Sequence, residues 1–129
     1  LALVPFSASA CRTHGMATDA PVFRAFSAEL FATAAATDKL VVLDLGTEWC
    51  HWCHVMERTT WSDPEVRVVL ARHYLAAAAD ADRRLDLAAR YQDYGWPATI
   101  VFAPDGRELW KNRGYVPPAR MVEILTQLA

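Results

Sequence analysis

Residues 40–53, LVVLDLGTEWCHWC, join an apolar run to a pair of cysteines. The first six residues are Leu and Val broken only by Asp44, which is typical of a strand buried on both faces. A Gly-Thr turn follows, and Cys50 then stands where a helix is expected to begin. Unpaired N–H groups and the helix dipole stabilise a thiolate at that position. The order therefore predicts a redox dithiol, with Cys50 as the exposed nucleophile and Cys53, one turn further and better buried, as the resolving thiol.

The string CHWCH, from Cys50 to His54, also fits the attachment sequence of a c-type haem. Both cysteines would form thioether bonds, His54 would be the proximal ligand, and Met121 or His73 could lie opposite. Small c-type cytochromes are helical shells around their cofactor, whereas this chain spends its apolar residues on buried strands. We therefore expect no haem.

A zinc ion would need about four ligands in tetrahedral geometry. A structural site normally gathers them from two separated pairs, and only Cys11 and His14 could supply a second pair. We expect neither a metal nor any other cofactor. Cys50, His51, Cys53 and His54 carry suitable ligand atoms, but all four lie within one stretch of five residues and do not form two separated pairs.

Length and composition set the class of protein. With 129 residues, 53% of them hydrophobic, the chain is long enough for one domain with a single core. The formal net charge is −2 and the 13 Lys and Arg residues are scattered, which gives no reason to expect a nucleic acid partner. Three cysteines are too few for a disulfide-rich secreted scaffold.

The first residues differ from the rest. We interpret residues 1–20 as a signal-peptide remnant or flexible segment, and residues 21–129 as the folded domain. Ala8-Ser9-Ala10 resembles a signal-peptidase site, and cleavage there would leave Cys11 first, as a possible lipid anchor. This pattern favours a periplasmic or otherwise extracytoplasmic location, with the cytoplasm as the alternative.

Periodicity and capping residues predict an α/β chain with the order α-β-α-α-β-α-β-β-α. Helix 64–73 should place Val66, Val69, Leu70 and His73 along one face, and a Pro-Asp-Gly turn should join two strands in a hairpin. The expected elements are a helix at 27–37 capped by Ser27, a strand at 40–45, a helix from Cys50, a helix from Pro64 capped by Asp63, a strand at 75–80, a helix at 84–95 ended by Gly95, hairpin strands at 98–103 and 108–115, and a helix at 117–128.

Two motifs in order resemble the thioredoxin superfamily. The stretch DKLVVLDLGTEWCHWCHVMERTTWSDPEV covers 38–66, and GWPATIVFAPDG covers 95–106. CHWCHVME is most similar to the thioredoxin-like domains of spermatogenesis-associated and YyaL-type proteins, with the C-terminal domain of DsbD also close. The resemblance implies a thioredoxin-like three-layer α/β fold, with a central mixed β-sheet flanked by helices.

The resemblance also implies roles for individual residues. Pro97 occupies the place of the family's cis-proline, which faces the dithiol, and Asp44, six residues before Cys50, matches the buried carboxyl that takes a proton from the resolving thiol. Trp49 would shield the dithiol, unless it is simply a core aromatic. Trp96 would line the substrate surface, unless its side chain simply packs against other residues of the protein.

His51, between the two cysteines, could stabilise the thiolate when protonated.

From the dithiol and the resemblance together, we expect a thiol-disulfide oxidoreductase that acts on protein disulfides or dithiols through a mixed disulfide and needs a separate redox partner. The alternative is a non-catalytic binding module of the same fold, with a vestigial or regulatory dithiol.

Overall fold

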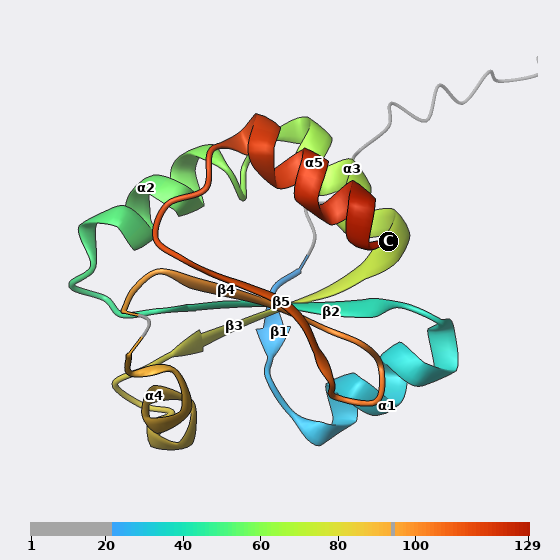
Figure 1. Ribbon diagram of the computed structural model, residues 1–129, viewed down its shortest axis with the longest axis horizontal. Helices are drawn as coiled ribbons and strands as arrows, with labels where there is room; N and C mark the ends of the chain where they lie inside the picture. Colours follow the sequence, from blue (N-terminus) through green and yellow to red (C-terminus); the bar gives the residue numbers. More distant parts are fainter. Residues whose placement is uncertain (1–21, 94) are drawn as a thin grey trace, which may run out of the picture.

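A computed structural model describes residues 22–93 and 95–129, which form a five-stranded sheet between two layers of helices (Figure 1). The α/β class expected from the sequence is confirmed. The interpretation of residues 1–20, including the possible lipid anchor at Cys11, concerns residues outside the described part of the chain. The elements are β1 (Arg24–Ala25), α1 (Ala28–Thr37), β2 (Leu40–Gly46), α2 (His51–Thr59), α3 (Pro64–His73), β3 (Tyr74–Asp80), α4 (Leu85–Tyr91), β4 (Ala98–Phe102), β5 (Glu108–Arg113) and α5 (Pro118–Leu128).

The central strand β2 carries the site. The strand order is β1-β3-β2-β4-β5; β2 runs parallel to β3 and antiparallel to β4, so the sheet is mixed. β2 is bonded along both edges, from Val41 opposite Phe102 to Leu45 opposite Ala98 on the β4 side. This double pairing fixes the end of β2 that leads into the cysteines.

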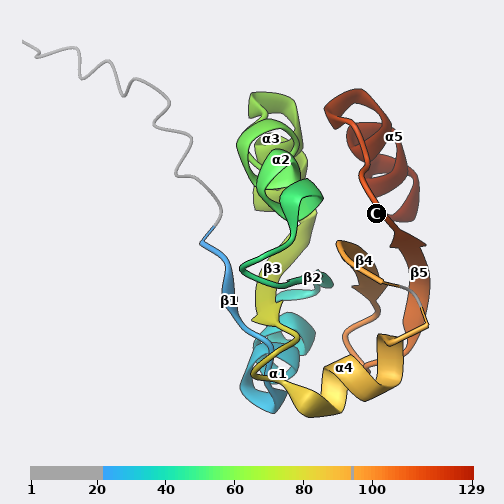
Figure 2. The ribbon, with the colours of Figure 1, turned by 90° about the vertical axis from the view of Figure 1, so that its left-hand side faces the viewer.

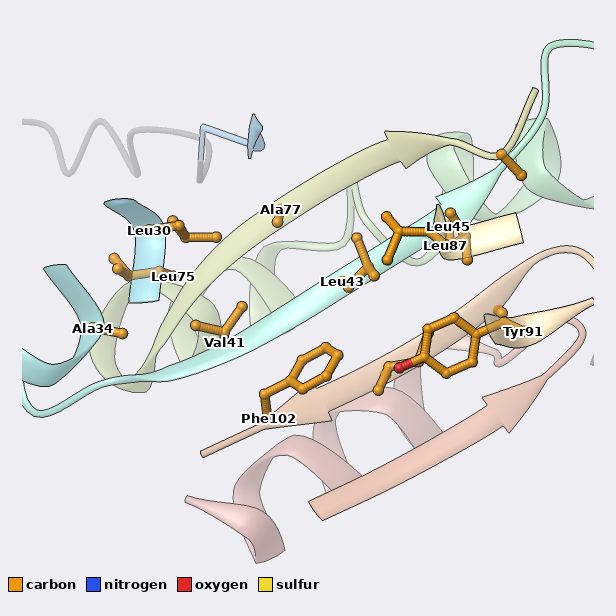
Figure 3. Packing of buried hydrophobic residues seen from close by; sticks show 13 residues of the cluster. Leu30, Ala34, Val41, Leu43, Leu45, Leu75, Ala77, Leu87, Tyr91 and Phe102 are labelled. Carbon is orange, nitrogen blue, oxygen red and sulfur yellow. The ribbon is translucent and has the colours of Figure 1, made fainter. Parts of the chain in front are cut away.

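Each face of the sheet has its own core. Helices α1 and α4 cover one face, and α2, α3 and α5 lie on the other (Figures 1 and 2). Side chains alternate along a strand, so Val41, Leu43 and Leu45 pack toward α1 and α4, as Figure 3 shows, while Val42 packs with the opposite cluster. Asp44 and Gly46 follow Val42 in this alternation and therefore belong to the α2 side.

The predicted capping residues are found at two helix starts. The Ser27 hydroxyl accepts a hydrogen bond from the Leu30 N–H at 3.3 Å. The Asp63 carboxylate accepts bonds from the N–H groups of Glu65 and Val66, and Pro64 occupies the first turn, where its missing N–H costs nothing.

Two expectations about the elements are wrong, and one strand was not predicted. Helix α4 ends at Tyr91, four residues before Gly95, because the buried Tyr91 ring is fixed by a bond from its hydroxyl to Glu108 of β5. His73 is exposed: α3 ends there, and the next residue, Tyr74, takes the buried position. The strand β1 was not predicted. It has only two residues, both exposed, and they form a strand only because they pair with the distant β3.

Candidate functional site

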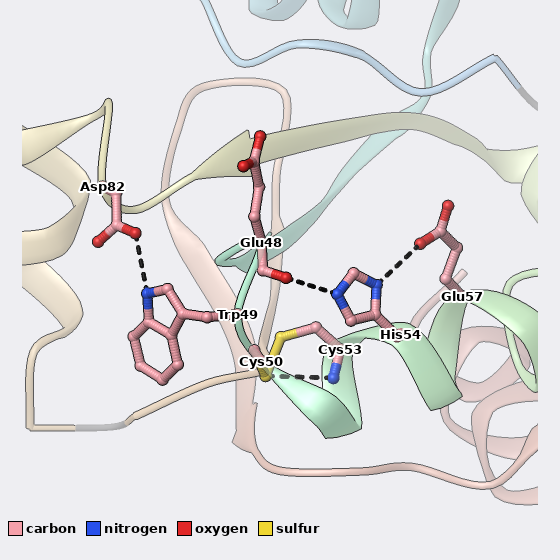
Figure 4. Close-up of a disulfide and its surroundings, with 7 residues drawn as sticks. All are labelled: Glu48, Trp49, Cys50, Cys53, His54, Glu57 and Asp82. Atoms are coloured by element: carbon pink, nitrogen blue, oxygen red, sulfur yellow. Dashed lines mark hydrogen bonds and ion pairs between the residues drawn. A yellow bond between two sulfur atoms is a disulfide. The ribbon is translucent and has the colours of Figure 1, made fainter.

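The two cysteines meet at the start of α2. Cys50 is the N-cap of the helix, and its Sγ accepts a hydrogen bond from the Cys53 N–H at 3.2 Å. The two residues form a disulfide with their Cα atoms 5.2 Å apart (Figure 4). A sulfur that already accepts a backbone N–H at a helix N-terminus is placed to be stabilised as a thiolate after reduction.

The exposure of the cysteines is the reverse of the expectation. Cys50 is only 6% exposed, whereas Cys53 is partly exposed. The Cys53 sulfur lies against Gly46 at the end of β2, where an added Cβ would come within 2.6 Å of the Cys53 Sγ. Because Gly46 has no side chain, the Cys53 sulfur fits against the strand and borders a cleft.

That cleft has a volume of about 430 Å³ and separates α2 from the ends of β2 and β3. It is rich in ionisable groups, and the Cys53 side chain forms part of its wall. Its lining residues are Asp44, Gly46, Thr47, Glu48, Cys53, His54, Glu57, Ala78, Ala79, Asp80 and Arg83.

Asp44 reaches the cleft from β2, on the same face as Gly46 and Cys53. Burial raises its pKa from 3.8 to about 7, and the negative charge of Glu57 adds to the shift. A contact with the indole N–H of Trp61 lowers it, although this N–H makes no full hydrogen bond within the described residues. The carboxyl can therefore both take up and release a proton near neutral pH.

The histidines and Trp49 lie on the exposed side of the motif. His51 stacks edge-on with Trp52 at 5.4 Å. The His54 Nε2 lies 2.6 Å from the backbone oxygen of Glu48, and its Nδ1 lies 3.8 Å from Glu57 (Figure 4). Trp49 is not a core aromatic, since it is 71% exposed, and its indole donates a 2.9 Å hydrogen bond to Asp82.

Pro97 stands at the same end of the sheet as the cysteines. Its neighbour Ala98 pairs with Leu45, so Pro97 directly precedes the first paired residue of β4 at this end of the sheet. The Trp96–Pro97 peptide bond is cis, and Pro97 is buried. Trp96 is partly buried against the core shared by α1 and α4.

The sequence reasoning missed Glu57 as a member of the site. Glu57 lies four residues after Cys53, one helical turn further along α2, so helix periodicity alone would have placed it on the same face. Within the described residues, no group of three or more His, Cys, Asp or Glu side chains is arranged to hold a metal ion. The same part of the chain contains no helix that is long and apolar enough to cross a membrane.

Comparison with known proteins adds three kinds of likeness. The family Thioredox_DsbH, described as "Protein of unknown function, DUF255", matches residues 14–128. Spermatogenesis-associated protein 20 of Mus musculus is 28% identical over 98 residues, which are 70% of this chain and 12% of that protein. The thiol:disulfide interchange protein DsbD of Ralstonia nicotianae is 39% identical over 83 residues, covering 62% of this chain and 14% of the relative.

The chain thus spans less than a sixth of either relative. Among solved structures, a thioredoxin from Thermus thermophilus superposes with a TM-score of 0.71 and 27% identity, covering 82% of this chain and 86% of that one. The oxidised C-terminal domain of Neisseria meningitidis DsbD gives 0.59 and 27%, covering 82% and 98%. These likenesses confirm the expected thioredoxin-like fold.

Proposed function

The chain belongs to the Thioredox_DsbH family, and from this premise we propose that it is a thiol-disulfide oxidoreductase that uses Cys50 and Cys53 on protein disulfides. One observation carries the proposal: Cys50 is the N-cap of α2, the helix that follows the central strand, and its sulfur accepts a hydrogen bond from the Cys53 N–H. A thiolate there attacks more readily at neutral pH than an ordinary cysteine.

The reaction has two steps. In the reduced protein, the Cys50 thiolate attacks one sulfur of a substrate disulfide, forming a mixed disulfide and releasing the other sulfur as a thiolate that takes a proton from water. Cys53 then gives its proton to the Asp44 carboxylate and attacks Cys50. This closes the Cys50–Cys53 disulfide and releases the second substrate thiolate. An external dithiol partner returns the protein to its reduced form, and the opposite sequence oxidises a substrate.

Other residues are assigned by their place around the dithiol. Pro97 would contact the bound substrate chain, supported by its position directly before Ala98, which pairs with Leu45 at the end of β2. Trp96 would contact it as well, since it directly precedes Pro97 and its side chain is only partly buried. Trp49 would contact the substrate through its exposed ring, which Asp82 holds in place. His51 would stabilise the Cys50 thiolate when protonated, supported by its position directly after Cys50 in α2.

Protein disulfides or dithiols, together with a redox partner, are the proposed binding partners. The support is the likeness to a protein named for thiol:disulfide interchange. We propose an extracytoplasmic location on the Ala8-Ser9-Ala10 pattern, with Cys11 as a possible lipid anchor. Cell fractionation and N-terminal mass analysis of the mature protein test this: an unprocessed, cytoplasmic chain would contradict it.

The proposed function is tested by trapping the mixed disulfide. Cys53→Ser, made with Cys11→Ser to prevent stray disulfides, should accumulate dithiothreitol-sensitive adducts with partner proteins through Cys50. The matched Cys50→Ser variant should accumulate none. Adducts through Cys53 would reverse the two roles.

A binding module remains the second candidate, because the 6% exposure of Cys50 limits the approach of a substrate disulfide. In that case the exposed Trp49 and Trp52 beside the dithiol would contact a partner without chemistry. No adducts from either variant, together with no insulin reduction by the unmodified protein, would select this candidate.

A further inference from the structure

The cleft beside Cys53 connects a largely buried carboxyl with solvent. Asp44 lies at its inner end, on β2, while Glu57 and His54 stand on the exposed surface of α2. The cleft is far larger than the roughly 30 Å³ that one water molecule occupies, and its walls carry several polar groups. Water can therefore join the inner carboxyl to the outer pair.

The orientation of His54 is set by two contacts. A backbone carbonyl can only accept a hydrogen bond, so the 2.6 Å contact with the Glu48 oxygen places a proton on His54 Nε2. In the neutral ring Nδ1 is then the nitrogen without a proton, and Nδ1 is the atom that faces the Glu57 carboxylate at 3.8 Å. The proton-exchanging edge of His54 is therefore turned toward Glu57.

The remaining charged groups of the cleft are engaged with one another. Arg83, which follows β3, lies 4.0 Å from the Glu48 carboxylate and 3.8 Å from Asp80. The Trp61 indole also approaches Asp44, but it cannot release a proton in this pH range. Among the described groups that face Asp44, Glu57 is the one that both has a free route to solvent and carries its own proton partner.

We propose that Glu57 and His54 form a proton-exchange pair that carries the Cys53 proton from Asp44 to solvent during release of the mixed disulfide. This inference rests on the proposed function. It gives His54 and Glu57, which belong to the motif CHWCHVME, a role in the movement of the proton. Electrons pass between sulfurs at the dithiol, whereas the proton leaves along the cleft on the far side of Cys53.

The proton balance closes at each transfer. The Cys53 thiol gives its proton to the Asp44 carboxylate and becomes the attacking thiolate. The protonated Asp44 passes that proton through cleft water to the Glu57 carboxylate, and Glu57 passes it to His54 Nδ1 or to bulk water. The charge of Glu57 also helps to keep the pKa of Asp44 near 7, which makes release from Asp44 as easy as uptake.

The test separates the two steps of the reaction in full-length protein carrying Cys11→Ser. Glu57→Gln should leave the rate of mixed-disulfide formation within about twofold and slow its release about tenfold or more near pH 7. Glu57→Ala should be slowed similarly, and added acetate, a small carboxylate, should restore its release. The NMR titration of the Asp44 side chain should move to lower pH in both variants, because a neighbouring negative charge is gone.

The matched control is Glu123→Gln. Glu123 is another exposed helical glutamate with a partner three residues away, Arg120 at 2.8 Å, but it lies on α5 and not in the cleft. It should change neither rate nor the Asp44 titration. Release at the unmodified rate in Glu57→Gln, or slowed release that acetate does not restore in Glu57→Ala, would overturn the inference. An unmodified protein that forms no mixed disulfide would instead overturn the proposed function, while the Asp44 titration would still report whether Glu57 acts on that carboxyl.

Discussion

Replacing Asp44 with Asn should change how the stability of the oxidised protein depends on pH. The carboxyl has a pKa of about 7 in the folded chain, against an ordinary value of 3.8. The folded chain therefore holds this proton more tightly than the unfolded chain. Between about pH 4 and 7 the unfolded chain binds fewer protons, so the free energy of unfolding falls as pH rises.

The size of this loss follows from the shift. About 3.2 pH units at about 1.4 kcal/mol per unit give about 4 kcal/mol, fully present above pH 7 and absent below pH 4. Asn cannot ionise, so Asp44→Asn should match the unmodified protein near pH 4 and exceed its free energy of unfolding by up to about 4 kcal/mol near pH 8. At the same time, disulfide turnover should slow, because the proton acceptor for Cys53 is lost.

Urea denaturation without reductant, at several pH values from about 4 to 8, measures the difference between the two proteins. Other titrating groups contribute to both curves and cancel. A constant offset would reflect packing of the amide and would leave the slope unaffected. Parallel curves, with no change in the difference across this range, would show that Asp44 ionises normally and would refute the account of its burial.

Gly46→Ala should lower the free energy of unfolding of the oxidised protein by about 1–3 kcal/mol, because the new Cβ would lie 2.6 Å from the Cys53 Sγ. Urea denaturation should show a smaller loss in the reduced protein, where the Cys53 sulfur can rotate away. Tyr74→Phe should cost about 1–2 kcal/mol in thermal or urea unfolding, since the Tyr74 hydroxyl donates a buried 2.7 Å bond to the Leu125 carbonyl; an unchanged midpoint would mean that water satisfies this carbonyl. In reduced protein near neutral pH, iodoacetamide followed by mass spectrometry should label Cys50 before Cys53, because of the helix N-terminus; the reverse order would show that exposure outweighs acidity.

The sequence predicts the parts of the fold that depend on local chemistry. The apolar run interrupted by Asp44 predicts β2, Asp63 followed by Pro64 predicts the start of α3, and the Asp-Gly turn predicts the β4–β5 hairpin. Each of these signals lies within a few neighbouring residues. Where the outcome depends on a distant partner, the prediction fails: α4 ends where Tyr91 meets Glu108, far away on β5.

The same distinction applies to the site. The sequence predicts that a helix starts at Cys50, and Cys50 is the N-cap of α2. The relative burial of Cys50 and Cys53 could not be predicted, because it depends on how α2 packs against the end of the sheet, which no local signal specifies. The part played by Glu57 was missed for a similar reason, since its effect on Asp44 acts through space between α2 and β2.

The alternation of side chains along β2 also links correct folding to chemistry. Val41, Leu43 and Leu45 fill one core, while Val42, Asp44 and Gly46 face the layer that contains the dithiol. Inserting or deleting one residue in this strand would exchange the two sets. The carboxyl would then enter a hydrocarbon interior, leucines would block the seat of the Cys53 sulfur, and stability and chemistry would be lost together. The specific activity of a refolded preparation, measured as the proposed disulfide turnover, should therefore be proportional to the fraction of molecules in which β2 has paired in the correct register. Turnover would then measure the yield of refolding.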